Sequence, residues 1–253
     1  MSDSPCKVTV VIDMGFEHLM NQRDLGKCLK QLMHCYSINR RLENPLQFHI
    51  TSFIGERLKN EMSRHHGYEN WDCIFHSDSY VEVFSASNIC DKDAQKISDT
   101  VTDDSDLLLT DSNQIKDIKS ENQPSINAKK VIYLTSESDN ILDHFDANCI
   151  YVIGGLVDHN HHKGICHRLA LEKGVSHARF PIQESGIDMK TRQVLTIDHV
   201  FRIIASVASE GQTWKDALVE TLPERKGAID ITKINGGDSK NKCDEKNTLV
   251  MDS

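Results

Sequence analysis

The stretch of sequence that decides the fold runs from Cys149 to Gly164 and reads CIYVIGGLVDHNHHKG. Its first five residues are apolar, which is typical of a buried strand. The pair Gly154-Gly155 ends this strand and lets the backbone approach a ligand closely, although many such turns have only structural reasons. Because ligands bind beyond the carboxyl ends of strands in open parallel sheets, we expect the polar loop that follows to belong to the functional site.

Strands and helices alternate on both sides of this stretch. Upstream, the predicted elements are a strand at Val8–Ile12, a helix at 22–42, a strand at Gln47–Thr51, a helix at 56–64 and a strand around 73–75. From residue 131 onward they are a strand at 131–134, a helix at 138–144, a strand at 149–153, a helix at about 164–173, a short strand before Arg179, a helix at 199–209 capped by Asp198, and a helix at 214–221. This alternation predicts an α/β fold, a parallel sheet with helices on both faces.

Two segments show no periodicity. Residues 85–128 are rich in Ser, Asp, Asn, Lys and Gln, and they hold nine acidic residues against four lysines. Their composition favours a solvated insertion loop over a regulatory tether. Residues 227–253 are predicted to be a disordered tail. The predicted domain therefore covers 7–226 and is interrupted at 85–128.

Composition restricts the class of protein. The net charge is -9, but the acidic insertion carries much of it, so the remainder can still present a local basic face. No apolar run approaches the ~18 residues of a membrane span, and residues 1–7 resemble neither a secretory signal nor a transit peptide. We therefore expect no membrane association and a location in the nucleus and/or cytoplasm. The eight cysteines form no CxxC pair and are expected to be reduced.

The histidine-rich loop raises other kinds of chemistry. Side chains of the types that bind zinc are present at Asp158, His159, His161, His162, Cys166 and His167. Their spacing matches neither HExxH nor a closed tetrahedral set, so no metal is predicted, and a metal hydrolase stays a minor alternative. Cys166 and His167 are neighbours on a helix and point in different directions, which argues against a thiol nucleophile. The sequence has no GxSxG, Walker A or GxGxxG motif.

With this loop in view, the chain resembles the tRNA (guanine(9)-N(1))-methyltransferase family of the SPOUT superfamily over about residues 7–226. The matching motifs are VVIDMGFEHLM (10–20), CYSINRR (35–41), PLQFHITS (45–52), YLTSES (133–138), YVIGGLVDHNHHKG (151–164), ARFPI (178–182), RQVLTIDHVF (192–201) and WKDALVETLPERK (214–226). Several motifs in the right order make the resemblance specific. The HNHHK variant is most similar to the nuclear and cytosolic branch of the family.

The resemblance implies a SPOUT-type fold whose C-terminal part is threaded into a trefoil knot, which sequence patterns alone do not predict. It also implies S-adenosyl-L-methionine as the methyl donor, tRNA as the substrate and a monomeric enzyme. The cofactor-binding positions carried over by motif are Leu134, Thr135, Gly155, His159, Asn160, His161, His162, Lys163, His167, Pro181, Val194, Leu195 and Thr196.

Asp158 matches the proposed general base of the family and is the predicted catalytic residue. Guanine N1 carries a proton near neutral pH, and its lone pair cannot attack a methyl group until that proton leaves. An ordinary aspartate, with a pKa of about 3.9, is a poor base unless burial raises its pKa, so a base and a positioning group both stay open. Asp13 matches a strand-end acid of the family, and capping the following turn is an equally good role for it.

The resemblance also assigns RNA contacts, for which phosphate binding asks only for positive charge in the right place. The predicted positions are Arg40, Arg41, Gln47, Lys163, Arg179, Arg192, Arg225 and Lys226. Two features depart from the family pattern: the first strand begins without a Lys/Arg-rich extension before it, and the insertion is long and acidic. They leave a second function open, a catalytically weak RNA-binding or scaffold protein that retains the fold.

Overall fold

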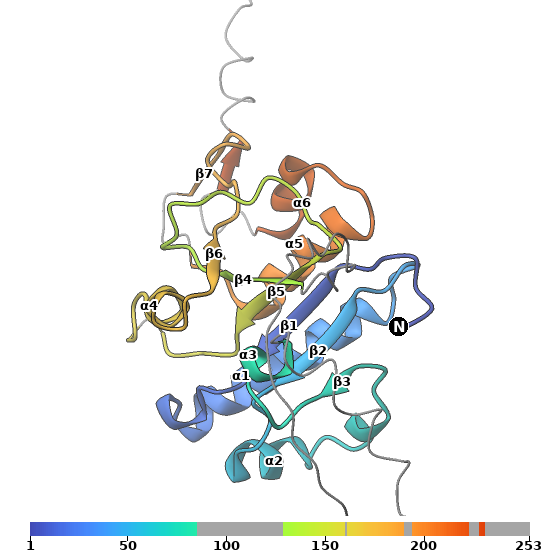
Figure 1. Ribbon diagram of the computed structural model, residues 1–253, viewed down its shortest axis with the longest axis vertical. Coiled ribbons are helices and arrows are strands. Elements are labelled where there is room, and N and C mark those ends of the chain that lie inside the picture. Colours follow the sequence, from blue (N-terminus) through green and yellow to red (C-terminus); the bar gives the residue numbers. More distant parts are fainter. Residues whose placement is uncertain (85–128, 160, 190–193, 223–227, 231–253) are drawn as a thin grey trace, which may run out of the picture.

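The computed structural model describes residues 1–84, 129–159, 161–189, 194–222 and 228–230. Its centre is a sheet of six parallel strands in the order β3-β2-β1-β5-β4-β6 (Figure 1). The strands are β1 (Thr9–Asp13), β2 (Gln47–Thr51), β3 (Ile74–Phe75), β4 (Lys130–Leu134), β5 (Cys149–Gly154) and β6 (Ser176–Ala178). The predicted parallel sheet is therefore confirmed, and β5 is the stretch that ends in the glycine pair.

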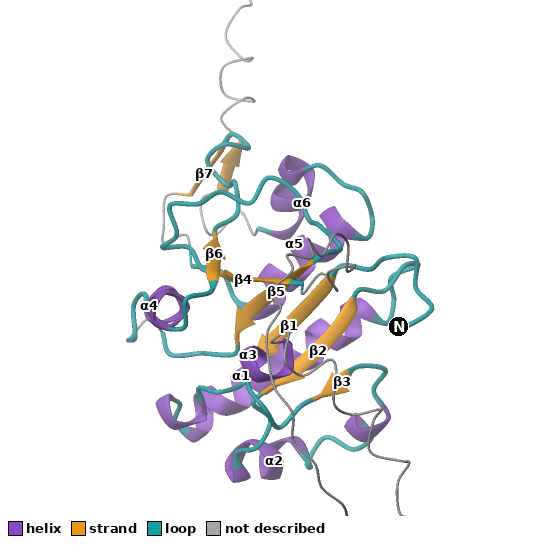
Figure 2. Ribbon diagram, in the orientation of Figure 1, coloured by secondary structure: helices purple, strands orange, loops and turns teal. Residues whose placement is uncertain are grey.

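The helices join these strands and cover the sheet (Figure 2). They are α1 (Gln22–Asn39), α2 (Glu56–Met62), α3 (Tyr80–Phe84), α4 (Ile165–Glu172), α5 (Ile197–Ala208) and α6 (Trp214–Thr221), with short 3-10 helices η1 (Glu17–Leu19) and η2 (Tyr68–Asn70). Helices lie between β1 and β2, between β2 and β3 and between β5 and β6, whereas β4 is joined to β5 without a helix.

Both faces of the sheet are buried, and neighbouring residues of β1 show how. Val10 packs in one cluster with Leu29 of α1 and Phe201 of α5. Val11 points to the other face and packs in a second cluster with Tyr80 of α3. Successive strand residues face opposite sides, so a strand covered on both sides reads as a continuous apolar run. This burial explains why the run at 8–12 was recognisable in the sequence.

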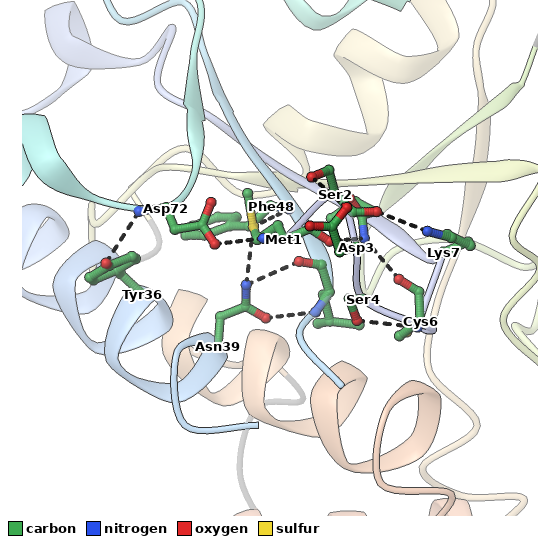
Figure 3. Close-up of polar contacts among 12 residues, drawn as sticks. Met1, Ser2, Asp3, Ser4, Cys6, Lys7, Tyr36, Asn39, Phe48 and Asp72 are labelled. Carbon is green, nitrogen blue, oxygen red and sulfur yellow. Dashed lines mark hydrogen bonds and ion pairs between the residues drawn. The ribbon is translucent and has the colours of Figure 1, made fainter. Parts of the chain in front are cut away.

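The end of α1 is tied to the start of β2 by a buried amide. Asn39 Nδ2 donates to the Leu46 carbonyl (3.0 Å), and Asn39 Oδ1 accepts from Leu46 N (2.9 Å). Met1 lies against the same place, with its amino group 2.6 Å from the Asp72 carboxylate (Figure 3). The carbonyl of Met1 accepts from Gln47 Nε2 at 3.0 Å. Asn39 thus satisfies both buried backbone groups of Leu46 where the connection enters the strand.

The predicted helix at 138–144 is wrong. Ser138 Oγ accepts from Asn140 N (3.1 Å) and lies 2.8 Å from His177 Nδ1, so this serine organises a turn instead of a helix. The backbone then pairs with the chain after β6: Arg179 N donates to the Asn140 carbonyl (2.8 Å), and Leu142 N donates to the Arg179 carbonyl (2.9 Å). Backbone groups engaged with a distant partner are not free to form a local helix.

Helix α5 starts two residues earlier than predicted. Its N-cap residue is Thr196, and Asp198 lies inside the first turn instead of capping it. The amide of Ile197 donates to Gln31 Oε1 of α1 at 2.9 Å. A side chain from another helix therefore satisfies one of the exposed amides at this helix start, a contact that no local sequence pattern reveals.

A two-stranded antiparallel sheet of β7 (Ile187–Met189) and β8 (Ala228–Asp230) was not predicted. Strand β8 corrects the expectation of a disordered tail at residues 228–230. Residues 231–253 and the insertion at 85–128 lie outside the described part of the chain. Helix α3, which leads into that insertion, was also missed, because five residues are too few for a helical period to be recognised in the sequence.

Candidate functional site

A pocket opens at the carboxyl ends of β4, β5 and β6. It is bounded by the loop after β4, the loop after β5 and the segment from β6 to the start of α5. The residues that line it are Leu134, Thr135, Ser136, Glu137, Ile153, Gly154, Leu156, Asp158, His162, Gly164, Ile165, Cys166, Ala178, Arg179, Phe180, Ile182, Val194, Leu195, Ile197 and Val200. Apolar walls with a few polar groups at the edge are typical of a site for a small organic ligand.

The glycine pair lets the loop after β5 cross the end of β1 in close contact. Gly155 N donates to the Asp13 carbonyl at 2.8 Å, and the Cys28 thiol donates to the Gly155 carbonyl at 3.3 Å. A Cβ atom on Gly155 would lie 2.6 Å from Met14 Sδ and 2.7 Å from the Asp13 carbonyl oxygen. Only glycine fits between these neighbours without movement of the backbone.

Asp158 lies at the start of the turn that leads to α4. Its carboxylate accepts a hydrogen bond from His162 N at 2.6 Å, and its carbonyl accepts from His161 N at 3.1 Å. The side chain is half-buried and lines the pocket. It therefore organises the loop and borders the pocket at the same time.

A second acid, Asp13, lies at the end of β1 beneath the loop and is 7% exposed. Its Oδ1 accepts from Gly15 N at 3.2 Å and from Ser52 Oγ at 2.9 Å, and the Tyr133 hydroxyl is 3.5 Å from Oδ2. Burial raises the pKa of Asp13, and these hydrogen bonds partly oppose the rise. The contact with Gly15 supports the capping role that the sequence left open.

Comparison with known proteins shows which family the chain belongs to. A family model described as tRNA (guanine(9)-N(1))-methyltransferase TRM10/TRM10A matches residues 1–227. The chain belongs to this family. The resemblance inferred from the motifs is thereby confirmed.

Two curated relatives of the TRM10/TRM10A family illustrate the likeness. The chain is 35% identical over 241 residues to the tRNA (guanine(9)-N(1))-methyltransferase Trmt10A of Drosophila melanogaster, covering 94% of this chain and 61% of that protein. It is 35% identical over 225 residues to tRNA methyltransferase 10 homolog A of Homo sapiens, covering 88% of this chain and 53% of that protein. The chain thus spans less than two thirds of the length of these relatives.

Solved structures show the same fold. The crystal structure of the full-length spTrm10–SAH complex has a TM-score of 0.64 and 25% identity, and the match covers 87% of this chain and 97% of that chain. The dual-specific Trm10 of Thermococcus kodakaraensis, at 16% identity and a TM-score of 0.55, shows the fold alone. The α/β architecture of the TRM10/TRM10A family is therefore present in this chain.

The structure gathers part of the predicted cofactor set around the pocket. Among the positions carried over by motif, Leu134, Thr135, His162, Val194 and Leu195 line it. Outside its lining are Gly155, His159, His161, Lys163, His167, Pro181 and Thr196, and Asn160 lies outside the described residues. His167 packs edge-on against His177, with ring centroids 4.5 Å apart. The cofactor role of every one of these residues stays a prediction.

The motif implies that His159 binds the cofactor, but in the structure its side chain contacts helix α1. Its Nε2 lies 3.2 Å from Asp24 Oδ1 and 2.9 Å from Lys27 Nζ, both in the first turns of α1. Its backbone φ is 51°, in the left-handed region that non-glycine residues rarely adopt. The ring is therefore directed to α1.

Those predicted RNA contacts that the structure describes do not form one surface. Arg40 and Arg41 are exposed just after α1, at the amino ends of the strands, whereas the pocket lies at the carboxyl ends. Gln47, expected at the substrate cleft, begins β2 at that same amino end and donates to the carbonyl of Cys6 at 2.9 Å as well as to Met1. Among the remaining positions, Arg192, Arg225 and Lys226 lie outside the described residues.

Arg179 lies at the pocket, but its charge is already paired. Its two terminal nitrogens donate to the two carboxylate oxygens of Glu184, at 3.0 and 2.7 Å. This hydrogen-bonded pair raises the pKa of Arg179 and lowers that of Glu184. An RNA phosphate would have to compete with Glu184 for this guanidinium.

Sequence reasoning missed some residues that line the pocket. Glu137 follows β4 within the YLTSES motif, and its position at a strand end was the available signal. Cys166 was considered only as a zinc-type side chain and as a thiol nucleophile, and burial raises the pKa of its thiol to about 11. Such a thiol is a poor nucleophile, which agrees with the argument against thiol catalysis.

Other kinds of site find no support in the described part of the chain. There, no group of three or more His, Cys, Asp or Glu side chains is arranged to hold a metal ion. Across these same ranges, none of the helices has the length and apolar character that crossing a membrane requires. The cysteines that the structure describes are all free thiols.

Proposed function

We propose that this chain transfers a methyl group from S-adenosyl-L-methionine to N1 of guanine at position nine of tRNA. The observation that carries the proposal is the pocket beside the glycine pair with Asp158 at its edge, in a chain of the TRM10/TRM10A family. Relatives with about 35% identity are named for this reaction, and the relative spTrm10 binds SAH, the demethylated donor, in its crystal structure. The scaffold alternative is not favoured, because the acid at the edge of the pocket and the glycine pair expected of the enzyme are both present.

The pocket suits this donor chemically. Leu134, Leu156 and Leu195 supply flat apolar walls for an adenine ring, and Thr135 and Glu137 supply polar groups near it. When bound, the donor supplies a methyl group on a positively charged sulfur. Carboxylates at the edge of the pocket favour such a charge. The other cofactor positions carried over by motif are proposed to contact the donor through the loop backbone or from its rim.

The residues of the chain then have two tasks, alignment and removal of a proton. The loop from Gly154 to Asp158 would hold guanine N1 in line with the methyl group, so that much of the acceleration comes from orientation. Asp158 is placed to accept a hydrogen bond from N1–H or from a water beside it. Its hydrogen bond with His162 N keeps the carboxylate oriented at the edge of the pocket.

The same proposal covers the partner, the assembly and the location. We propose that the protein acts on tRNA as a monomer in the nucleus and/or cytoplasm, and that its C-terminal part is threaded as a trefoil knot. Convergence of three loops on one pocket at the carboxyl ends of β4, β5 and β6 supports a knotted site. Among the predicted RNA contacts, Arg179 lines the pocket and Lys163 is exposed on the loop after β5.

The test is methyl transfer from labelled S-adenosyl-L-methionine to unmodified tRNA that carries G or A at position nine. We expect incorporation into the G9 tRNA and a loss of about 10²–10⁴-fold in kcat for Asp158→Asn if the residue is a base. Asp143→Asn, an exposed loop substitution, serves as the matched control and should keep wild-type activity. A pH–rate profile separates the two roles, because a positioning group lowers the rate equally at every pH.

Absence of incorporation into either tRNA, with SAH still bound in calorimetry, would contradict the enzyme and leave the scaffold protein. Absence of both incorporation and SAH binding would contradict the cofactor assignment itself.

A further inference from the structure

We infer that Asp24 of α1 is a positioning residue for the loop that carries Asp158, and that it acts through His159. The inference rests on the proposed function, because it assigns Asp24 a part in aligning that site. Asp24 itself does not line the pocket. It is 8% exposed, unusual for a carboxylate, and its contacts lead to the residue next to Asp158 in the chain.

The first step of the argument is the backbone at His159. A φ of 51° places His159 in the left-handed region, which costs a residue with a side chain free energy that the surrounding structure must offset. The strained residue directly follows Asp158. Without a contact that holds it, the loop would relax toward ordinary backbone angles and carry the Asp158 carboxylate with it.

Two side chains of α1 contact His159: Lys27, whose Nζ lies 2.9 Å from His159 Nε2, and Asp24, whose carboxylate is itself fixed. Asn21 Oδ1 accepts from Asp24 N at 2.9 Å, and Asn21 Nδ2 donates to Asp24 Oδ2 at 2.7 Å, a reciprocal cap at the start of α1. The other oxygen, Oδ1, faces Lys27 Nζ at 3.0 Å and His159 Nε2 at 3.2 Å. The hydrogen bond from Lys27, together with His159, lowers the pKa of Asp24, so the carboxylate stays charged.

A second contact ties the same loop to the same helix. The Cys28 thiol, one turn further along α1 from Asp24, donates to the Gly155 carbonyl at 3.3 Å. The loop is therefore attached to α1 at Gly155 and again at His159, with Asp158 between the two attachments. This arrangement fixes the direction from which Asp158 approaches the pocket.

The chain provides a matched control for Asp24. Asp216 makes the same reciprocal cap at the start of α6: Thr213 Oγ1 accepts from Asp216 N at 3.2 Å and donates to Asp216 Oδ2 at 2.7 Å. Asp216 lies on a helix that contributes no residue to the pocket lining. Asp24→Asn and Asp216→Asn therefore perturb equivalent caps, and only the first should disturb the loop.

The first experiment measures amide hydrogen exchange in the full chain, which needs no activity. In Asp24→Asn we expect faster exchange at the amides of Gly155, His161 and His162, whose hydrogen bonds hold the loop, while Asp216→Asn leaves them unchanged. If the loop amides exchange equally fast in both variants, and both variants unfold at the same temperature, the inference is overturned whatever their methyl-transfer rates.

The second experiment is a double-mutant cycle on methyl transfer. Asp24→Asn should lower kcat about tenfold by misalignment, with the KM for the donor and the SAH dissociation constant changed much less. Glycine at position 159 adopts the left-handed backbone freely and removes the contact with Asp24. In the His159→Gly background, Asp24→Asn should therefore change kcat by less than about twofold.

A failure of this inference can be distinguished from a failure of the proposed function. A wild-type protein without methyl transfer would contradict that function, while the exchange comparison would still test the attachment of the loop. Equal losses of kcat for Asp24→Asn in both backgrounds would show that Asp24 does not act through His159.

Discussion

At the scale of the residue, Gly155 shows how one missing side chain shapes the site. Gly155→Ala would bring a Cβ to 2.6 Å from Met14 Sδ and 2.7 Å from the Asp13 carbonyl oxygen, so the loop must move. We expect a loss of about 1–3 kcal/mol in the free energy of unfolding and weaker SAH binding, measured by urea denaturation and calorimetry. Gly26→Ala is the control: its Cβ would meet only Glu61 Oε1 at 3.8 Å, and alanine in a helix should leave stability unchanged or raise it. Unchanged SAH binding by Gly155→Ala would contradict this account.

Asp13 gives a second prediction at this scale. Burial raises its pKa above 3.8, so the folded state holds a proton that the unfolded state has lost. The stabilisation from this proton is present below pH 3.8 and is lost as the pH rises through the raised pKa of the folded state. The stability of Asp13→Asn relative to wild type should therefore increase with pH in urea titrations from acid to neutral.

Asp198 should behave in the opposite way and serves as the comparison. Burial would raise its pKa, but polar neighbours, among them His34 with Nδ1 3.3 Å from the carboxylate, outweigh this effect and lower it. The wild type should therefore lose stability relative to Asp198→Asn as the pH falls. The same pH trend for both variants would show that Asp13 is not buried as described.

At the scale of the element, the connection between α1 and β2 depends on Asn39. Asn39→Ala would leave the amide and the carbonyl of the fully buried Leu46 without their partner. Each unsatisfied buried group costs about 1–3 kcal/mol, so the free energy of unfolding should fall by at least that much. Asn60→Ala, at an exposed position of α2, should change it little. Urea denaturation compares the two, and equal small losses would mean that water replaces the amide.

At the scale of the whole molecule, net charge opposes RNA binding while single cations favour it. The net charge is -9, so tRNA affinity must come from local positive side chains. We expect tRNA affinity to fall with salt and Lys163→Gln to reduce the slope of log K against log salt by about one. Lys59→Gln, on an exposed face of α2, should leave the slope unchanged. A slope that Lys163→Gln does not change would remove this lysine from the RNA surface.

Arg40 tests how far along the molecule the RNA reaches. It lies at the amino ends of the strands, and the pocket lies at the carboxyl ends. If the position carried over from the family is correct, Arg40→Gln should also lower the salt slope by about one in the same titration. An unchanged slope would confine the RNA to the pocket end.

Much of the fold could be predicted because its central strands are buried on both faces. β1 and β5 are buried at nearly every position and read as nearly unbroken apolar runs, whereas β2 alternates polar and apolar residues. The glycine pair was also recognisable in the sequence. Its second member, Gly155, must be glycine because a Cβ atom there would collide with the Asp13 carbonyl oxygen. Five of the predicted cofactor positions, together with Asp158, meet at one pocket because motifs at the carboxyl ends of parallel strands converge there.

Sequence by itself thus determined the six strands of the parallel sheet, most of the helices and the loop in which the chemistry is proposed to occur. The tertiary structure alone decided the course of 138–144 and the start of α5, where the amide of Ile197 binds Gln31. It also decided the pairing of β7 with β8 and the direction of His159 toward Asp24. The physical reason is the same in each case. These features depend on hydrogen bonds between residues far apart in the chain, whereas burial and helical period are properties of neighbours.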